Sequence, residues 1–155
     1  MSNPLRLRPY QTEDCPVLAQ LFYDTIHSVN LGDYTQAQVD AWACGTVNQA
    51  RWDRELRSRA AEVAELDGQI VGFGDMTETG YLDRLFVHRD YQRRGVASAI
   101  CGALEARVDV PCYTVHASLT ARPFFERRGY TVTQRQEVER RGVKLPNFAM
   151  EKRRA

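Results

Sequence analysis

The sequence contains no apolar run that approaches the roughly 20 residues needed to cross a bilayer as a helix. Its first ten residues, MSNPLRLRPY, also lack the apolar core of a secretory signal. These two absences argue against a membrane protein and against a secreted one. We therefore expect a cytoplasmic protein.

A strong charge of one sign is absent as well. The 155 residues include 21 Lys and Arg against 20 Asp and Glu, so the formal net charge is +1. No global field would draw the chain to nucleic acid or anionic lipid, and the aromatic residues form no recognisable stacking surface. A small or locally charged partner is expected, and a nucleic-acid module is the weakest alternative.

Closely spaced metal ligands are also missing. The four cysteines are Cys15, Cys44, Cys101 and Cys112, with no CxxC pair and no Cys/His cluster of the kind that zinc needs. This spacing predicts free thiols in a reducing compartment and no metal site.

No internal repeat, low-complexity tract or Pro/Gly/Ser-rich linker divides the chain. Its length suits one domain, and its 43% hydrophobic residues are enough for a substantial core. Residues 1–155 are therefore predicted to form a single domain.

Helical spacing marks the first third of the chain. Thr12 is a plausible N-cap for a first helix, whose apolar residues are Leu18, Leu21, Phe22, Ile26 and Val29. Thr35 and Gln38 match a capping box and predict a second, shorter helix. The arginine-rich segment 51–59 is interpreted as a solvated helix face, with attraction of an anionic acceptor as the alternative.

The rest of the chain alternates between strands and helices. Strands are predicted over 5–8, 62–66, 69–76, 81–87, 112–118, 130–138 and 145–152, and helices from Val96 and over 120–128. Asp67-Gly68 tolerates positive φ and predicts a two-residue hairpin turn. Alternation over 81–87 places Tyr81, Asp83, Leu85 and Val87 on one face. The fold class is α/β (α+β) with a mixed sheet.

The most informative segment is Gln92-Arg93-Arg94-Gly95-Val96-Ala97, which lies between a predicted strand and an amphipathic helix. Unpaired backbone N–H groups point outward at such a turn. Gly95 permits close approach of a ligand, and the arginines add positive charge beside the helix dipole. These features predict a site for a phosphate-bearing cofactor, although an ordinary solvated turn would have a similar local sequence.

In context, the run from Leu85 to Ala97 resembles the signature of the GNAT N-acetyltransferases, a strand that leads into a (Q/R)xxGx(G/A) loop. The segment from Ser118 to Tyr130 is similar to a later strand-to-helix segment of that family. Further similarities at Asn30, Tyr34 and Ala41-Trp42 indicate a group of uncharacterised bacterial members.

The resemblance implies the GNAT fold and acetyl-CoA as the acetyl donor, with no metal. A central, mostly antiparallel sheet of about six to seven strands would be flanked by helices, and a bulged strand over 81–87 would splay from a parallel neighbour over 112–118. The resulting cleft would bind the cofactor through Leu85, Val87, Gln92, Arg93, Arg94, Gly95, Val96, Ala97, Ser98, Ser118 and Phe125.

The implied reaction is direct attack of a neutral primary amine on the thioester. Alkylammonium ions have a pKa of roughly 10, so a base or a chain of water must remove the proton. Asp83, which matches a catalytic Glu of some relatives, is the first candidate, and His116 is the second. A salt-bridged Asp83 and a buried, hydrogen-bonded His116 are the alternatives.

One feature of the sequence leaves the chemistry open. Phe125 stands where many family members have a Tyr thought to protonate the departing thiolate, so Tyr113, Tyr130, Ser118 or water would take that role. An acyl-CoA-binding sensor without transfer is therefore an alternative function.

The resemblance places acceptor recognition at His27, Asn30, Tyr34 and Trp42, where core packing and a polar loop are the alternatives. The acceptor itself, a small molecule or a peptide amine, stays open. Homodimerisation is an expectation from the family.

Overall fold

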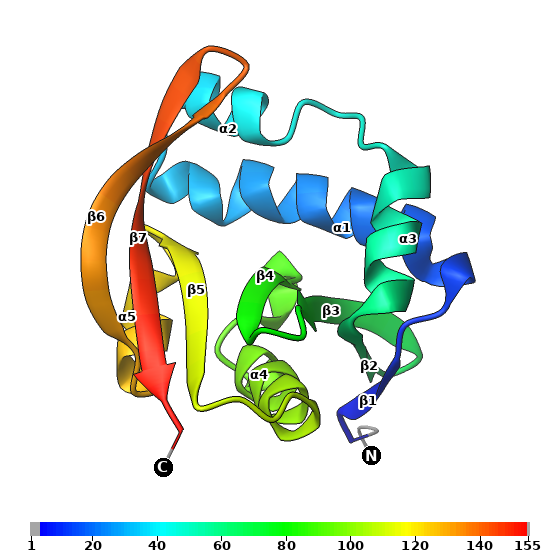
Figure 1. Ribbon diagram of the computed structural model, residues 1–155. Coiled ribbons are helices and arrows are strands. Elements are labelled where there is room, and N and C mark those ends of the chain that lie inside the picture. Colours follow the sequence, from blue (N-terminus) through cyan, green and yellow to red (C-terminus); the bar gives the residue numbers. More distant parts are fainter. Residues whose placement is uncertain (1–3, 155) are drawn as a thin grey trace.

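A computed structural model describes residues 4–154 and shows one seven-stranded sheet in the order β1-β2-β3-β4-β5-β7-β6 (Figure 1). The β4–β5 pair is parallel and the other neighbours are antiparallel. The strands are β1 (Arg6–Pro9), β2 (Ala60–Leu66), β3 (Gln69–Met76), β4 (Tyr81–Val87), β5 (Cys112–Ser118), β6 (Thr131–Arg140) and β7 (Val143–Arg153). The predicted mixed, mostly antiparallel sheet is confirmed.

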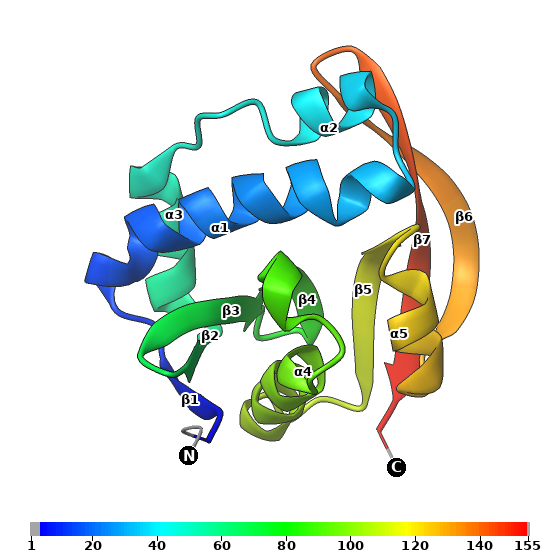
Figure 2. The same cartoon turned by 180° about the vertical axis from the view of Figure 1, so that it is seen from behind.

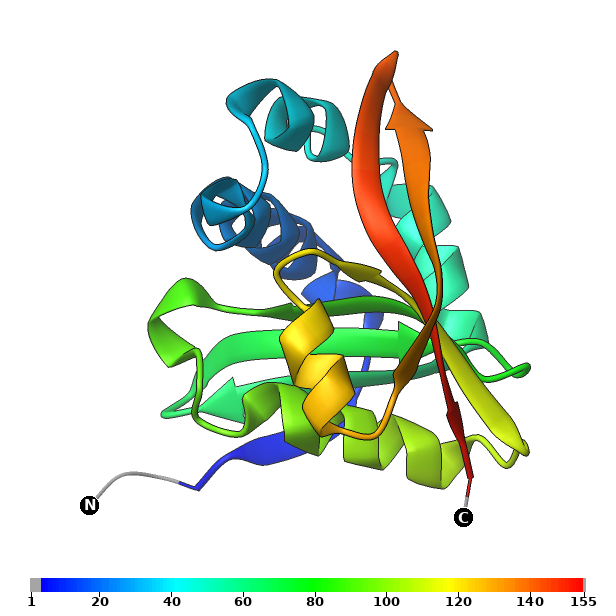
Figure 3. The ribbon, with the colours of Figure 1, turned by 90° about the vertical axis from the view of Figure 1, so that its left-hand side faces the viewer.

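Helices cover both faces of this sheet. They are α1 (Cys15–Ser28), α2 (Gln36–Trp42), α3 (Gln49–Ser58), α4 (Val96–Arg107) and α5 (Arg122–Arg127). There are also three short 3-10 turns in residues 4–154: η1 (Thr12–Asp14) lies between β1 and α1, η2 (Asn30–Gly32) between α1 and α2, and η3 (Arg89–Tyr91) between β4 and α4. Figure 3 shows α1 on one side of the strands and α4 on the other, and Figure 2 shows α5 beside β5 and β7.

Each face of the sheet has its own core. Under α4, the buried residues include Val71, Met76, Leu82, Ile100 and Leu104. On the opposite face, α1 and α3 bury Leu18, Leu21, Trp52 and Leu56 against Val63 and Phe73. A third cluster, which includes Ile26, Tyr34, Val39 and Leu145, holds α2 against β7. Burial of these side chains is the main force that fixes the helices on the sheet.

Local sequence motifs determine where the first two α-helices begin. The capping box is confirmed, since Thr35 Oγ1 accepts from the Gln38 amide at 3.1 Å and Gln38 Oε1 accepts from the Thr35 amide at 2.9 Å. The prediction of Thr12 as the N-cap of α1 was wrong. Thr12 begins η1, and Asp14 caps α1, because the Asp14 carboxylate accepts the Gln11 amide and closes a turn first.

Two hairpin turns have the same backbone form. Asp67 (φ 54°) and Gly68 (φ 78°) confirm the predicted two-residue turn between β2 and β3. Arg141 (φ 49°) and Gly142 (φ 79°) form a second such turn, so the β6–β7 ladder continues to Arg140 and Val143. The predicted strands, over 130–138 and 145–152, were too short at this turn, because the charged residues 139–141 do not have the apolar alternation typical of a strand.

A bulge in β4 corrects the predicted strand face. Asp75 pairs with Arg84 and Met76 with Leu82, so Asp83 is an extra residue in the ladder. Leu82 and Val87 therefore lie in the core under α4, whereas Asp83 bonds to Arg59 at the end of α3. Asp83 and Val87 do not share a face, because one inserted residue reverses the alternation.

Candidate active site

The strands β4 and β5 stay together over only two residue pairs, Tyr81–Thr114 and Leu82–Val115. Beyond these pairs they diverge, as Figures 1 and 2 show. A cavity of about 720 Å³ opens there, lined by β4, the turn before α4, β5 and α5. The divergence also leaves the facing strand edges without a neighbour, so their backbone polar groups can bind an extended ligand.

All of the predicted cofactor residues except Arg94 line this cleft: Leu85, Val87, Gln92, Arg93, Gly95, Val96, Ala97, Ser98, Ser118 and Phe125. The Arg94 guanidinium instead lies over the Tyr91 ring, 5.2 Å from its centroid. These residues, which were predicted to bind one ligand, come from β4, the turn and first residues of α4, β5 and α5, and the structure brings them together.

The turn before α4 is built to receive an anion. Gly95, the N-cap, has φ 79°, and a Cβ atom added there would meet no atom within 4 Å. The Ala99 amide makes the first helical bond, to the Gly95 carbonyl at 3.0 Å. The amides of residues 96–98 consequently have no acceptor in the helix and add to its positive dipole end.

Side-chain bonds fix this turn in place. The Gln92 side-chain amide donates to the Val87 carbonyl at 2.6 Å, which ties the turn to the end of β4. Arg128 donates to Ser98 Oγ at 3.2 Å and so connects α5 to the first turn of α4. Its neighbour Arg127 lines the cleft. Arg127 was not among the predicted site residues, because its only sequence signal is an arginine pair at the end of a short helix.

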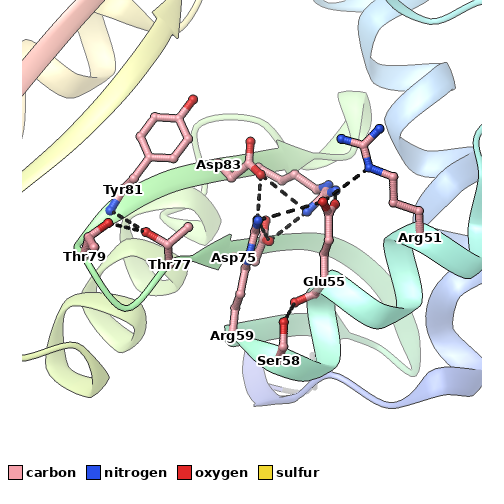
Figure 4. A network of polar contacts seen from close by, with 10 residues as sticks. Arg51, Glu55, Ser58, Arg59, Asp75, Thr77, Thr79, Tyr81 and Asp83 are labelled. Atoms are coloured by element: carbon pink, nitrogen blue, oxygen red, sulfur yellow. Dashed lines mark hydrogen bonds and ion pairs between the residues drawn. The ribbon is translucent and has the colours of Figure 1, made fainter.

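The far end of the cleft contains the two candidate bases. Asp83, in the β4 bulge, bonds to Arg59 Nη1 through Oδ2 at 2.6 Å. Figure 4 shows the second carboxylate oxygen pointing away from this network. His116 is exposed on β5 with its ring edge-on to Tyr81 at 5.2 Å between centroids. The alternative of a buried His116 is thereby contradicted, whereas the salt-bridged Asp83 is observed.

A buried charge network supports Asp83. Asp75 is fully buried, and its Oδ2 accepts from Arg59 at 3.0 Å and from Arg84 at 2.8 Å. Arg84 also bonds to Glu55 and lies over the Trp52 ring. Burial raises the pKa of Asp75 against the opposing effect of the Arg84 charge. This network was not predicted from the sequence, because its members come from three separate regions of the chain, α3 with its C-cap, β3 and β4.

We expect Asp75→Ala to destabilise the protein by about 3–5 kcal/mol, because it leaves two guanidinium groups without their shared partner. Asp75→Asn keeps an acceptor oxygen and should cost less. Urea unfolding of both variants gives the free energies of unfolding. A loss below about 1 kcal/mol for Asp75→Ala would show that the network contributes little to the fold.

Of the side chains proposed as the general acid, the structure places only one at the cleft. Phe125, which has no hydroxyl group, is 2% exposed and packs against Tyr130. The Tyr113 hydroxyl donates to the Glu105 and Val108 carbonyls, each at 2.8 Å, and Tyr130 donates to the Glu105 carboxylate at 3.0 Å. Both phenols are therefore held away from the cleft, whereas Ser118 lines it.

A smaller cavity of about 260 Å³ adjoins the cleft. The two share Trp42, Asp83, Phe86, His116 and Ser118. Because the candidate bases line both cavities, a molecule in the smaller one would meet a ligand in the larger one at Asp83 and His116.

The predicted acceptor residues fall into different environments. Asn30 lines the large cleft, Tyr34 the smaller cavity, and Trp42 both. The Tyr34 hydroxyl donates to the Pro146 carbonyl at 2.7 Å and accepts from the Leu119 amide at 2.9 Å. His27 bonds to the Ala43 carbonyl at 2.7 Å and lines neither cavity.

Three further structural findings concern metal binding, membrane-spanning helices and thiols. Within residues 4–154, no group of three or more His, Cys, Asp or Glu side chains could hold a metal ion. No helix in the same range has the length and apolar character to cross a membrane. The four cysteines are free, and none of them lines the cleft or the smaller cavity.

The diverging strands and the turn before α4 define the class of protein. The family model described as acetyltransferase (GNAT) domain matches residues 30–152. The chain therefore belongs to the GNAT acetyltransferase family, which confirms the family and the enzyme class predicted from the sequence.

Three known proteins are similar to this chain over nearly its whole length. The uncharacterised N-acetyltransferase YafP of Escherichia coli K12 is 38% identical over 149 residues, which cover 96% of this chain and 95% of YafP. A crystal structure of a GCN5-related N-acetyltransferase from Rhodopseudomonas palustris has 35% identity and a TM-score of 0.90, covering 99% of this chain and 98% of that one. PaiA N-acetyltransferase from Thermoplasma acidophilum, solved with coenzyme A, shares the fold at 14% identity, with a TM-score of 0.76 and coverage of 98% and 100%.

Proposed function

We propose that this protein transfers the acetyl group of acetyl-CoA to a primary amine by direct attack in a ternary complex. The observation that carries the proposal is the separation of charge in the cleft. Arg93 and Arg127 lie near the turn before α4, whereas Asp83 and His116 lie where β4 and β5 begin to diverge. One end thus suits an anionic cofactor and the other an amine.

The residues present fit acetyl-CoA. The free amides of residues 96–98, with Arg93 and Arg127, would bind the pyrophosphate. The unpaired edges of β4 and β5, including the backbone of Leu85 and Val87, would hold the amide-containing pantetheine arm. When bound, acetyl-CoA supplies an acetyl group on a thioester that a neutral amine can attack.

The chain's own contribution to the reaction is removal of a proton from the amine. Arg59 holds one oxygen of Asp83, so the other oxygen has a fixed direction in which to attract an ammonium group and accept its proton. His116 lines the same wall and is the second candidate. Since no cysteine lines the cleft, the chain offers no thiol there to carry an acetyl group.

A structure with the same fold supports the cofactor, and the free thiols support the compartment. PaiA, which shares the fold, was solved with coenzyme A. Four free cysteines agree with the cytoplasm as the place of action. The family also makes a homodimer a reasonable proposal, and the near-neutral charge gives no reason to invoke nucleic acid.

The alternative is an acyl-CoA sensor, favoured by the missing hydroxyl at Phe125. The leaving thiol has a pKa of roughly 8.5, however, so it departs without strong acid assistance. The test measures free thiol release from acetyl-CoA against a panel of small amines and peptides, with calorimetry of acetyl-CoA binding in parallel. Release with one class of amine is expected, and tight binding without release from any amine would establish the sensor.

A further inference from the structure

The smaller cavity contains three hydrogen-bond donors that the protein leaves largely unused. They are the Tyr81 hydroxyl, the His116 ring and the Arg140 guanidinium, which all line its wall. Within residues 4–154, the side chains of Tyr81 and His116 make no hydrogen bond, and Arg140 donates only to the adjacent Glu139 carbonyl at 3.1 Å. Grouped donors without protein acceptors suit a ligand that brings acceptor atoms of its own.

The charged residues that line this cavity differ in whether they have an ionic partner. Asp83 is paired with Arg59, and Arg84 is paired with Glu55 and Asp75. Arg140, by contrast, has no ion pair with any residue between 4 and 154. Arg140 is exposed, so its guanidinium is available to a ligand at this wall.

Tyr81 is suited to donate its proton in a hydrogen bond. Burial, followed by the negative charge of Asp83, raises the pKa of this phenol, against a smaller lowering effect of Arg140. The hydroxyl consequently stays protonated at neutral pH and can donate to a carboxylate.

The polar residues of the cavity differ in what else they line. Asp83 and His116 also line the large cleft, whereas Tyr81 and Arg140 line only the smaller cavity. Much of the remaining wall is apolar, with Phe22, Trp42, Phe86, Val138 and Leu145. A bound molecule would thus meet the candidate bases with one polar group, Arg140 and Tyr81 with a second, and the apolar part of the wall with its side chain.

We propose that the acceptor is a small amine that carries a carboxylate and an apolar side chain, as amino acids do. Its amine would lie at the wall shared with the cleft, and its carboxylate would accept hydrogen bonds from Arg140 and Tyr81. This assignment rests on the proposed function, because it treats the smaller cavity as the acceptor side of an acetyltransferase.

The test compares acceptors that differ only in the carboxylate: phenylalanine with phenethylamine, and leucine with isoamylamine. In the wild type, we expect the amino acid of each pair to have a kcat/KM at least about 10-fold higher. Arg140→Met should lower kcat/KM for the amino acids by about 10- to 100-fold, mainly through KM, because it removes a charge-assisted bond. The simple amines should change by less than about threefold.

Arg153→Met is the matched control, since Arg153 is exposed and lines neither cavity. The proposal is overturned if the wild type uses each simple amine as well as its amino acid. It is equally overturned if Arg140→Met impairs both members of a pair alike.

A binding measurement separates this proposal from the proposed function. Calorimetry with coenzyme A present compares N-acetylphenylalanine and N-acetylphenethylamine, the products of one pair. We expect the wild type to prefer the carboxylate by at least about 10-fold and Arg140→Met to lose that preference. If no amine releases thiol but this preference exists, the transferase proposal fails and the carboxylate site stands. Equal affinity for both products would refute the site.

Discussion

Gly95→Glu is expected to weaken acetyl-CoA binding by at least about 100-fold, which corresponds to about 2.8 kcal/mol. The new side chain would put a carboxylate beside the free amides at the start of α4, where the pyrophosphate is proposed to bind. Its Cβ atom would meet no atom within 4 Å, so the protein has room for the first atom of the side chain. Calorimetry of acetyl-CoA binding measures the effect.

The matched control is Gly142→Glu. Gly142 has the same φ of 79° and the same open surroundings, but it lies in the β6–β7 turn. Both variants carry the strain of a left-handed non-glycine residue, about 1 kcal/mol, and the same added charge. Loss of binding should be confined to Gly95→Glu. Wild-type affinity in that variant would show that the cofactor does not bind at this turn.

Asp83→Asn should lower kcat/KM by about 100- to 1,000-fold at neutral pH and leave acetyl-CoA affinity unchanged. Without the carboxylate, the reaction depends on the small fraction of amine that is already neutral. The rate of the variant should therefore rise about tenfold per pH unit toward the amine pKa of roughly 10. A pH–rate profile of both proteins tests this.

Glu137→Gln serves as the control, because Glu137 is an exposed carboxylate on β6 that lines neither cavity. A wild-type pH profile in Asp83→Asn would contradict the role of Asp83. The proton would then pass to His116 or to water, and His116→Gln would distinguish those two acceptors.

Much of the fold could be predicted because its signals are local. The capping box at Thr35 and the Asp67-Gly68 turn each depend on the chemistry of a few adjacent residues. The turn around Gly95 was recognisable for the same reason, since a glycine and basic residues between a strand and a helix are consecutive in sequence.

The site was harder to predict, because its parts meet only in three dimensions. The bulge at Asp83 is a property of the register between β3 and β4, and strand alternation alone cannot reveal it. Asp75 and Arg59 were missed because a buried pair from separate elements leaves no spacing pattern. Arg140 was overlooked because the β6–β7 hairpin extends further than the charged sequence suggested.

Direct transfer in a ternary complex is tested by an initial-rate study in which acetyl-CoA and an amine acceptor are both varied. The two ligands are proposed to lie in adjoining cavities with a shared wall, so both must be bound before transfer occurs. We therefore expect turnover with double-reciprocal lines that intersect. Parallel lines would indicate an acetylated enzyme intermediate, and they or a complete lack of turnover would contradict direct transfer in a ternary complex.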